Sequence, residues 1–270
     1  MSLRFRVLGS GSSGNATLVE GGGTRILLDA GLGARELAER LESAGIDPAA
    51  LALVLLSHEH GDHARGASAF SRKWGVRLAG SRGTYAAAGL GAIEIAGYDV
   101  LTPGSARRVG ALAVTAVPVP HDAAAPVAFV VSFDGCSLGH ATDLGHLSRP
   151  LVEAFRSCNA VLLESNYDAG MLRDGPYPWS LKERILSPLG HLSNGDVARF
   201  LQADLGDACE TVVLAHLSQK NNHPEVARMA AETALRRGDR DVRLKMTGPE
   251  GTGWIDVRRP TDGQLRLFRD

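Results

Sequence analysis

The sequence is poor in cysteine, with only Cys136, Cys158 and Cys209 among 270 residues. The three are scattered, odd in number and form no Cys-x-x-Cys pair, which excludes a disulfide framework and a cysteine-rich metal site. The economical interpretation is that they are buried free thiols in a reducing cytoplasm. The first residues, Met1 to Arg6, also lack the apolar region of a signal peptide. We therefore expect a cytoplasmic protein.

Net charge and long apolar runs are missing as well. The 29 Lys and Arg residues nearly balance the 30 Asp and Glu residues, so the formal net charge is -1. Such a chain has no bulk attraction to nucleic acid or to an anionic membrane, and a polyanion would have to be held by a local basic patch or by metal ions. No apolar run approaches the roughly 20 residues that span a bilayer. We expect no membrane partner, and the sequence leaves the oligomeric state open.

The composition that remains is that of an ordinary globular protein, 44% hydrophobic and 22% charged. Strand-like patterns dominate both ends, helical patterns lie between them, and no repeat or Pro/Ser-rich linker interrupts the order. Polar residues follow apolar strands again and again, at positions 58–63, 121, 143, 164 and 216. This pattern favours one α/β (α+β) domain over residues 1–270, with one site built by loops at one edge of layered sheets.

Apolar periodicity, caps and turn residues predict the individual elements. A helix is expected to begin directly after His63 and to end at Trp74. Residues 89–110 are expected to be irregular, with strand-like pieces around Ile93 and Val109. The other elements expected near the polar positions are a helix over 34–44, a small helix capped by Ser81, a hairpin turning at Asp134-Gly135, a strand over 160–168, helices over 179–186 and 195–205, the latter capped by Ser193 or Asn194, and strands over 242–246 and 254–268.

The segment Gly9 to Gly14 matches the GxGxxG fingerprint of dinucleotide-binding proteins. That fingerprint requires a helix directly afterwards, whereas residues 15–20 continue as a strand. A strand, a loop, a strand, a glycine turn and a third strand over 25–29 form an antiparallel opening, which argues against a Rossmann domain. The backbone amides of the Ser/Gly loop could still approach an anion. A plain hairpin connection is an equally well supported alternative.

The segment Leu53 to His63 organises the chain. A short run of Leu and Val predicts a buried strand, and it ends abruptly in the polar sequence SHEHGDH over residues 57–63. Three histidines interleaved with Asp62 at this spacing predict a metal-ligand loop and not a merely solvated one. Imidazole and carboxylate together suit zinc, manganese or iron, and not calcium.

Other strand exits supply further candidates, namely His121, Asp143 and His216. Together with the loop, these make five histidines and two aspartates, more than one tetrahedral metal can use but suited to two metals that share a carboxylate. The predicted ligands are His58, His60 and His121 for the first metal, Asp62, His63 and His216 for the second, and Asp143 as the bridge. Glu59 and Gly61 are then spacers. A hydroxide held between two metals roughly 3.5–4 Å apart would be the nucleophile.

The remaining histidines have simpler interpretations. His140 and His146 flank Asp143 and are expected to be non-ligands, and His223 lies in a polar loop where solvent would surround it. His191 differs because it precedes a predicted helix N-terminus, where a histidine and backbone amides can jointly meet a phosphate. Glu164, at a strand end, either orients His191 or serves as an ordinary ion-pair partner.

The spacing His58-x-His60-x-Asp62-His63, followed by His121, Asp143 and His216, resembles the metallo-β-lactamase superfamily. The resemblance is closer to its YycJ/WalJ-type hydrolases. It rests on segments spread over the chain from the first strand to residue 218, namely residues 7–15, 56–63, 141–143, 164–168, 190–194 and 214–218.

This resemblance implies a four-layered αββα sandwich with a dinuclear site at the sheet edge. It implies two divalent metal ions, zinc or manganese with iron as a further option, and 5′-to-3′ exonuclease activity on DNA. Similarity to tRNase Z implies that Glu164 and His191 form a pair in which the histidine serves the leaving group. The implied catalytic residues are Asp62, His191 and Glu164. The implied substrate contacts are Ser10, Ser12, Asn15, Asn166 and His191.

Three other functions stay open at this point. The same metals could hydrolyse a small cyclic phosphodiester, lactone or thioester, or could cleave RNA as tRNase Z does. The third alternative is a metal-bearing interaction domain without catalysis, against which the complete ligand set argues. The chain has no room for the lid domain of β-CASP nucleases and shows no tRNase Z exosite arm. Candidate phosphate contacts, each with solvation as the simpler alternative, are Arg65, Arg72, Lys73, Arg82, Lys182, Arg184 and Lys220.

Overall fold

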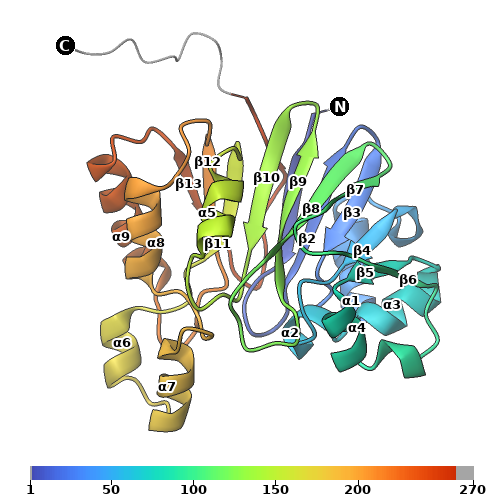
Figure 1. Ribbon diagram of the computed structural model, residues 1–270, viewed down its shortest axis with the longest axis horizontal. Coiled ribbons are helices and arrows are strands. Elements are labelled where there is room, and N and C mark those ends of the chain that lie inside the picture. The colour runs from blue at the N-terminus through green and yellow to red at the C-terminus, as the bar shows by residue number, and fades with distance from the viewer. Residues whose placement is uncertain (1, 260–270) are drawn as a thin grey trace.

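Two seven-stranded sheets pack face to face, and helices cover both outer faces (Figure 1). The structure is a computed structural model that describes residues 2–259. One apolar cluster fills the space between the sheets, and it includes Phe5 and Ile26 of one sheet and Phe129 and Leu162 of the other. The helix–sheet–sheet–helix layering confirms the predicted αββα sandwich.

The first sheet holds the N-terminal strands and is antiparallel at one end and parallel at the other. β1, β2 and β3 pair antiparallel, which confirms the predicted antiparallel opening of the chain. β3 to β6 pair parallel. Every residue of β4 is buried, in keeping with its run of Leu and Val. The spatial order is β14 (Ile255–Asp256), β1 (Arg4–Gly9), β2 (Ala16–Gly21), β3 (Thr24–Leu28), β4 (Leu53–Leu55), β5 (Leu78–Gly80) and β6 (Tyr98–Val100).

The second sheet is antiparallel from β7 to β10 and parallel from β10 to β13. The hairpin between β9 and β10 turns at Asp134 and Gly135, whose φ angles of 48° and 70° are those of the predicted tight turn. The spatial order is β13 (Arg243–Met246), β12 (Thr211–Ala215), β11 (Ala160–Glu164), β10 (Cys136–Ala141), β9 (Val127–Phe133), β8 (Leu112–Pro118) and β7 (Ala106–Val109).

Helices bury apolar stripes against the outer sheet faces. Leu37 and Phe70 join the cluster on the first sheet, and Phe155, Phe200 and Ala231 join the cluster on the second. The helices are α1 (Ala34–Ser43), α2 (Gly61–Ala64), α3 (Ala67–Trp74), α4 (Arg82–Ala87), α5 (Arg149–Phe155), α6 (Ala169–Asp174), α7 (Trp179–Leu186), α8 (Asn194–Ala203) and α9 (Pro224–Arg237), with 3-10 turns η1 (Pro48–Ala50) and η2 (Leu90–Ala92). Within residues 2–259, none of the helices combines the length and the apolarity needed to cross a bilayer.

The helix expected over 64–74 is instead two helices, which corrects the prediction. α2 begins at Gly61, so that Asp62 and His63 lie inside it, and α3 begins at Ala67. The break falls at Gly66, whose backbone N–H donates to the carbonyl of Ala30 at 2.8 Å. A Cβ atom at Gly66 would lie 2.1 Å from the carbonyl oxygen of Leu32. This close packing against the 30–32 segment interrupts the helix.

Three other boundaries differ from the sequence expectations. Ile93 is not in a strand and is 40% exposed, while β6 forms at Tyr98–Val100 nearby. The strand expected over 160–168 ends at Glu164, and α6 follows it, with Asp168 accepting a hydrogen bond from the N–H of Met171 as N-cap. The final strand forms only at Ile255–Asp256, and the rest of the stretch expected to 268 lies partly outside the described residues.

One polar contact crosses the apolar space between the sheets. His140 of β10 is 3% exposed, and its Nε2 lies 3.1 Å from Oγ1 of Thr17 in β2. Burial disfavours the charged imidazole and lowers the pKa of His140 to about 4. The neutral ring is therefore part of the native packing between the sheets.

We predict that His140 makes the fold acid-sensitive. Because the folded pKa lies below the ordinary value of 6.5, the unfolded chain takes up this proton first as the pH falls. The stability that is lost between about pH 6.5 and pH 4 is on the order of 3 kcal/mol. In urea unfolding, the free energy of unfolding of His140→Gln should fall less steeply over this pH range than that of the wild type. His146→Gln, a change of an exposed histidine, is the matched control, and equal slopes for wild type and H140Q would refute the prediction.

Candidate metal centre

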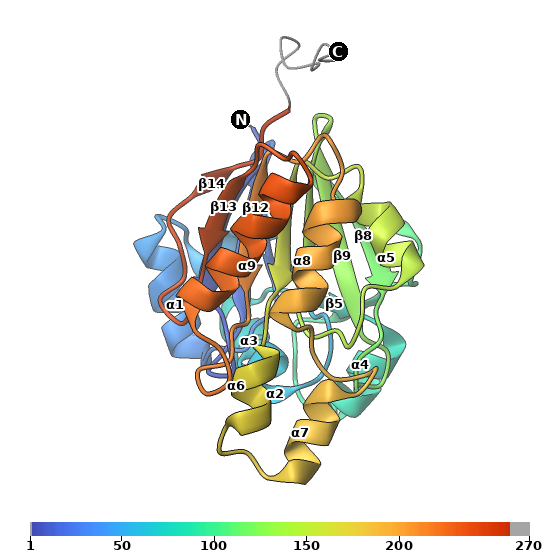
Figure 2. The ribbon, with the colours of Figure 1, turned by 90° about the vertical axis from the view of Figure 1, so that its left-hand side faces the viewer.

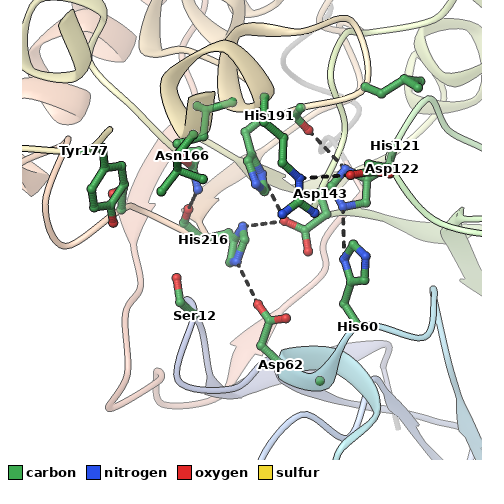
Figure 3. Close-up of a pocket in the computed structure, with 17 residues that line it drawn as sticks. Ser12, His60, Asp62, His121, Asp122, Asp143, Asn166, Tyr177, His191 and His216 are labelled. Atoms are coloured by element: carbon green, nitrogen blue, oxygen red, sulfur yellow. Dashed lines mark hydrogen bonds and ion pairs between the residues drawn. The ribbon is translucent and has the colours of Figure 1, made fainter. Parts of the chain in front are cut away.

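The predicted metal ligands come together at one end of the two sheets. His58 follows β4, His121 follows β8, Asp143 follows β10 and His216 follows β12. Asp143 and His216 have φ angles of 58° and 53°, in the left-handed region that few residues other than glycine adopt. Such backbone conformations at strand exits are typical of functional sites. Figure 3 shows several of these side chains facing one another across a pocket.

His58, His60 and His121 form one donor group, as predicted for the first metal. Their ligand nitrogens lie within 4.8 Å of one another, and Nε2 of His121 is 3.4 Å from Nδ1 of His60. Nδ1 of His121 lies 3.1 Å from the carbonyl oxygen of Gly190 and can donate to it, which leaves Nε2 free for a metal. Burial, together with the charge of His63, lowers the pKa of His58 well below its usual value. His58 is therefore a neutral imidazole, the form that binds metal.

Asp62, His63, Asp143 and His216 form a second donor group, which has the membership predicted for the second metal and its bridge. Oδ2 of Asp143 lies 2.5 Å from Nε2 of His63 and 3.5 Å from Nε2 of His58. The carboxylate of Asp143 therefore lies between the two groups. Burial alone would raise its pKa, but the charges of His216 and His63 hold the pKa well below the usual range. Asp143 is thus an ionised carboxylate in the interior.

The donor chemistry of these groups fits cations. Nε2 of His58 and Nε2 of His216 are buried without a hydrogen bond among the described residues. Groups in this position are normally satisfied, so each needs another partner. Although burial opposes it, the carboxylates of Asp143 and Asp29 raise the pKa of His63 to about 10. A divalent cation would displace such a proton and neutralise the same carboxylates. The His and Asp groups are therefore positioned to bind metal ions.

Asp29 supports this centre, and sequence reasoning missed it. It is 0% exposed, and its carboxylate accepts hydrogen bonds from the N–H of Ser57 at 2.7 Å and from Oγ of Ser57 at 2.9 Å. Its Oδ2 also lies 2.8 Å from Nδ1 of His63. A carboxylate on one ring nitrogen fixes the tautomer and turns the other nitrogen to the metal. The signal was present, since Asp29 directly follows β3 just as the recognised residues follow other strands.

Glu164 is fully buried and contacts two histidines. Its Oε1 lies 2.6 Å from Nδ1 of His191 and 3.1 Å from Nδ1 of His216, and its Oε2 accepts from the N–H of Leu144 at 3.1 Å. Although burial opposes ionisation of the carboxyl, the charge of His191 lowers the pKa of Glu164. This geometry allows Glu164 to orient His191, and the same contacts are ion pairs with both histidines. Its contact with His216 was not foreseen.

A cavity of about 410 Å³ opens next to the two donor groups. Its lining includes the predicted residues Ser12, Asn166 and His191 together with Asp62 and Asp143, but not Ser10 or Asn15. The lining residues labelled in Figure 3 surround this space.

Ser10 and Asn15, expected to contact substrate, instead hold the site from behind. Oγ of Ser10 accepts from the N–H of His216 at 2.8 Å. The side chain of Asn15 bonds to both backbone groups of Gly11 and lies 3.0 Å from Nε2 of His63. Both side chains are almost completely buried. The Ser/Gly loop therefore packs inward at these two positions, and the predicted substrate contacts of Ser10 and Asn15 stay a prediction.

The basic residues predicted as phosphate contacts also differ in position, because some make internal hydrogen bonds and one lines the pocket. Nζ of Lys182 donates to the carbonyls of Arg173 and Gly175, both at 2.7 Å, and so braces the connection between α6 and α7. Arg65 donates to the carbonyls of Ser13 and Gly31. Among the seven candidates, Arg184 lines the described pocket. Its Nε donates to Oδ2 of Asp122 at 2.9 Å.

Glu59, interpreted as a spacer, has a structural contact. Its Oε1 accepts from the backbone N–H of Ala124 at 2.8 Å, which ties the metal loop to the segment after His121. The segment before His191 is tied down too, because the N–H of Asp122 donates to the carbonyl of Leu189 at 3.1 Å. Short contacts between loops therefore fix the positions of the ligands.

Comparison with known proteins agrees with this geometry. The family profile described as "Beta-lactamase superfamily domain" matches residues 24–244. The chain belongs to this superfamily. Exodeoxyribonuclease WalJ of Streptococcus pneumoniae is 33% identical over 246 residues, which cover 90% of this chain and 91% of that protein. Exodeoxyribonuclease YycJ of Bacillus anthracis is 34% identical over 237 residues, which cover 87% and 90%. The closer resemblance predicted from the motifs is thereby confirmed.

A solved structure shows that the superfamily fold extends over the chain. The metallo-beta-lactamase fold protein YhfI from Bacillus subtilis aligns with a TM-score of 0.74 and covers 95% of this chain and 100% of its own. Its sequence identity is 15%, so this likeness concerns the fold alone.

We predict that Asp29→Asn weakens metal binding in this superfamily member while the fold is retained. Asparagine keeps the shape and tolerates the φ of 62° at this position, but it loses the charge that orients His63. Loss of such a supporting carboxylate lowers metal affinity by about 10- to 100-fold. Competition with a fluorescent chelator measures the effect, and Asp47→Asn, at an exposed position, is the control. Equal affinities for D29N and wild type would contradict the role given to Asp29.

Proposed function

We propose that this protein is a metal-dependent exodeoxyribonuclease that uses two divalent cations. The observation that carries the proposal is the position of Asp143, whose carboxylate joins the donor group of His58, His60 and His121 to that of Asp62, His63 and His216. Two neighbouring donor groups with a shared carboxylate suit a two-metal phosphodiesterase. The names of the WalJ and YycJ relatives, which cover nearly the whole chain, support DNA as the substrate.

The ligand assignment that we propose for the two donor groups is the one expected from the sequence. His58, His60 and His121 would hold one cation, Asp62, His63 and His216 the other, with Asp143 between them. Zinc and manganese suit this set, and iron is a further option. When bound, such cations polarise a phosphate oxygen and lower the pKa of water so that it can attack at neutral pH. With a net charge of -1, the chain depends on such local cations to hold a polyanion.

His191 would supply the proton for the leaving oxygen. Its ring lines the pocket, and Glu164 holds its Nδ1 at 2.6 Å, which leaves Nε2 for the substrate. Although burial opposes protonation, the charge of Glu164 raises the pKa of His191 to about 10. A protonated imidazole at this place is a general acid. Glu164 is then a positioning residue, because it acts through His191.

The thiols support a reducing compartment. Cys136, Cys158 and Cys209 are all free, and the latter two are buried. Burial raises the pKa of both buried thiols to about 12, so neither is a reactive thiolate. These observations agree with a cytoplasmic location, in which disulfides are rare.

Substitution of a ligand tests the metal chemistry. His60→Ala and Asp143→Ala should each reduce the rate of DNA degradation by more than about 100-fold. Loss of a residue that only supports a metal ligand already lowers activity by up to about 100-fold, and loss of a ligand should cost more. Metal-stripped protein reloaded with manganese or zinc should be assayed, with circular dichroism to confirm folding. His146→Ala, a change of an exposed histidine outside the donor groups, should keep full activity. Full activity in H60A or D143A would overturn the ligand assignment.

End-labelled substrates test the reaction. We propose the 5′-to-3′ polarity that the family resemblance implies. DNA labelled at its 5′ end should then release labelled mononucleotide at once, whereas 3′-labelled DNA should shorten gradually. Activity should fall steeply with salt, since phosphate contacts release counterions. RNA of the same sequence and bis(p-nitrophenyl) phosphate run in parallel. A preference for RNA would show that RNA is the substrate. A preference for the small ester, without salt dependence, would show that the substrate is a small molecule.

A further inference from the structure

One side of the pocket is formed by residues that the metal centre does not use. Tyr177, just before α7, lines the pocket together with Leu181 and Ile185 of α7 and with Leu189 behind it. In Figure 3, Tyr177 lies across the pocket from Asp122, with Asn166 and His216 between them. In both ribbon views, α6 and α7 lie at the same end of the molecule as α2, which carries Asp62 and His63 (Figures 1 and 2). An aromatic and aliphatic wall therefore faces a polar metal centre.

This wall is well supported from behind. Tyr177 and Leu181 pack against a small apolar cluster of Tyr167, Leu172 and Ile185. The bonds from Lys182 to two carbonyls, described above, close the connection between α6 and α7. A surface that is fixed in this way can offer a ring face at little cost in ordering on binding.

One permanent positive charge lies on the Asp122 side of the pocket, opposite Tyr177. Arg184 is the single Arg or Lys among the described residues that line the pocket, where it accompanies Asp62, Asp122 and Asp143. Its ion pair with Asp122 joins side chains that are 58% and 55% exposed. Exposed pairs of this kind contribute little to stability. A phosphate can therefore replace Asp122 as the partner of the guanidinium.

The two features together match one chemical unit. A flat aromatic ring with aliphatic neighbours accepts any nucleobase, because every base has a π-face. A guanidinium at the edge of the same pocket can donate hydrogen bonds to the phosphate attached to that nucleoside. A lactone, a thioester or an inorganic phosphate would use at most one of these features.

We propose that the wall formed by Tyr177, Leu181 and Ile185 holds the base of the terminal nucleotide, and that Arg184 binds the phosphate attached to the same nucleoside. This inference rests on the proposed exonuclease function and adds the substrate group that the pocket accepts. Tyr177 and Arg184 then determine specificity for a nucleotide end, and the metal centre performs the cleavage.

A strand with an abasic terminal nucleotide tests the role of Tyr177. Release of the first residue is compared for two 5′-phosphorylated strands, one with thymine and one with a tetrahydrofuran unit at the end being digested. The wild type should prefer the thymine end by about 10-fold or more in kcat/KM, within the range of base–aromatic stacking. Tyr177→Ala should lose most of this preference, and Tyr177→Phe should keep it. Trp179→Ala is the matched control, since Trp179 starts α7 but is 64% exposed and outside the pocket lining.

The outcomes separate the two proposals. Wild-type protein without activity on either strand would defeat the exonuclease function itself. An active wild type that treats both ends alike, or a Tyr177→Ala variant that keeps the full preference, would contradict the role of the wall in base binding but not the exonuclease function. Misfolding of Tyr177→Ala would lower the activity on both strands, whereas loss of stacking lowers it on the thymine strand alone, and Tyr177→Phe, which keeps the ring, should behave as the wild type.

Salt dependence tests the role of Arg184. Replacing one phosphate-binding residue reduces the salt slope of DNA binding by about one unit. Arg184→Ala should show this reduction in fluorescence anisotropy with wild-type and variant proteins, and a raised KM with little change in kcat. Arg173→Ala, at an exposed arginine of α6 paired with Asp174, is the control. An unchanged slope in R184A would remove Arg184 from the substrate site.

Discussion

The buried negative charge of Asp143 is the constraint on which the rest of the site depends. Its carboxylate lies within 3.5 Å of nitrogens of His58, His63, His191 and His216. An ionised carboxylate in the interior is very costly unless cations or donors surround it. The αββα arrangement supplies them by directing strand exits from both sheets to the same point. The geometry of the site therefore depends on the compensation of this charge by the four histidines.

Around that point, buried polar residues hold the candidate metal ligands in place. Asp29 fixes His63, Ser10 fixes the backbone of His216, and Glu164 contacts both His191 and His216. None of these three supporting side chains lines the described pocket. Their buried contacts explain how a site assembled from distant segments keeps its geometry, although most of the candidate ligands lie in loops and only Asp62 and His63 lie in a helix.

The sequence predicted those parts of the site that depend on local patterns. The apolar runs that end in His58, His121, Asp143 and His216 are visible in one dimension, and so is the spacing from His58 to His63. Features that arise from distant contacts were missed. The helix break at Gly66 follows from its approach to Leu32, and the inward packing of Ser10 and Asn15 follows from their contacts with His216 and His63. Propensity and spacing carry no information on such approaches.

The connection between α7 and α8 has an evolutionary consequence. Within it, the carbonyls of Leu189 and Gly190 fix Asp122 and His121, and a Cβ at Gly190 would lie 2.1 Å from the carbonyl oxygen of Ile185. The next residue is His191. Because this short stretch joins the wall of the pocket to the candidate ligand His121 and to His191, the proposed acid, an insertion or deletion here would displace all three together. Divergence of substrate range in such proteins should therefore proceed through exchanges of side chains on α7, with the length of this connection preserved.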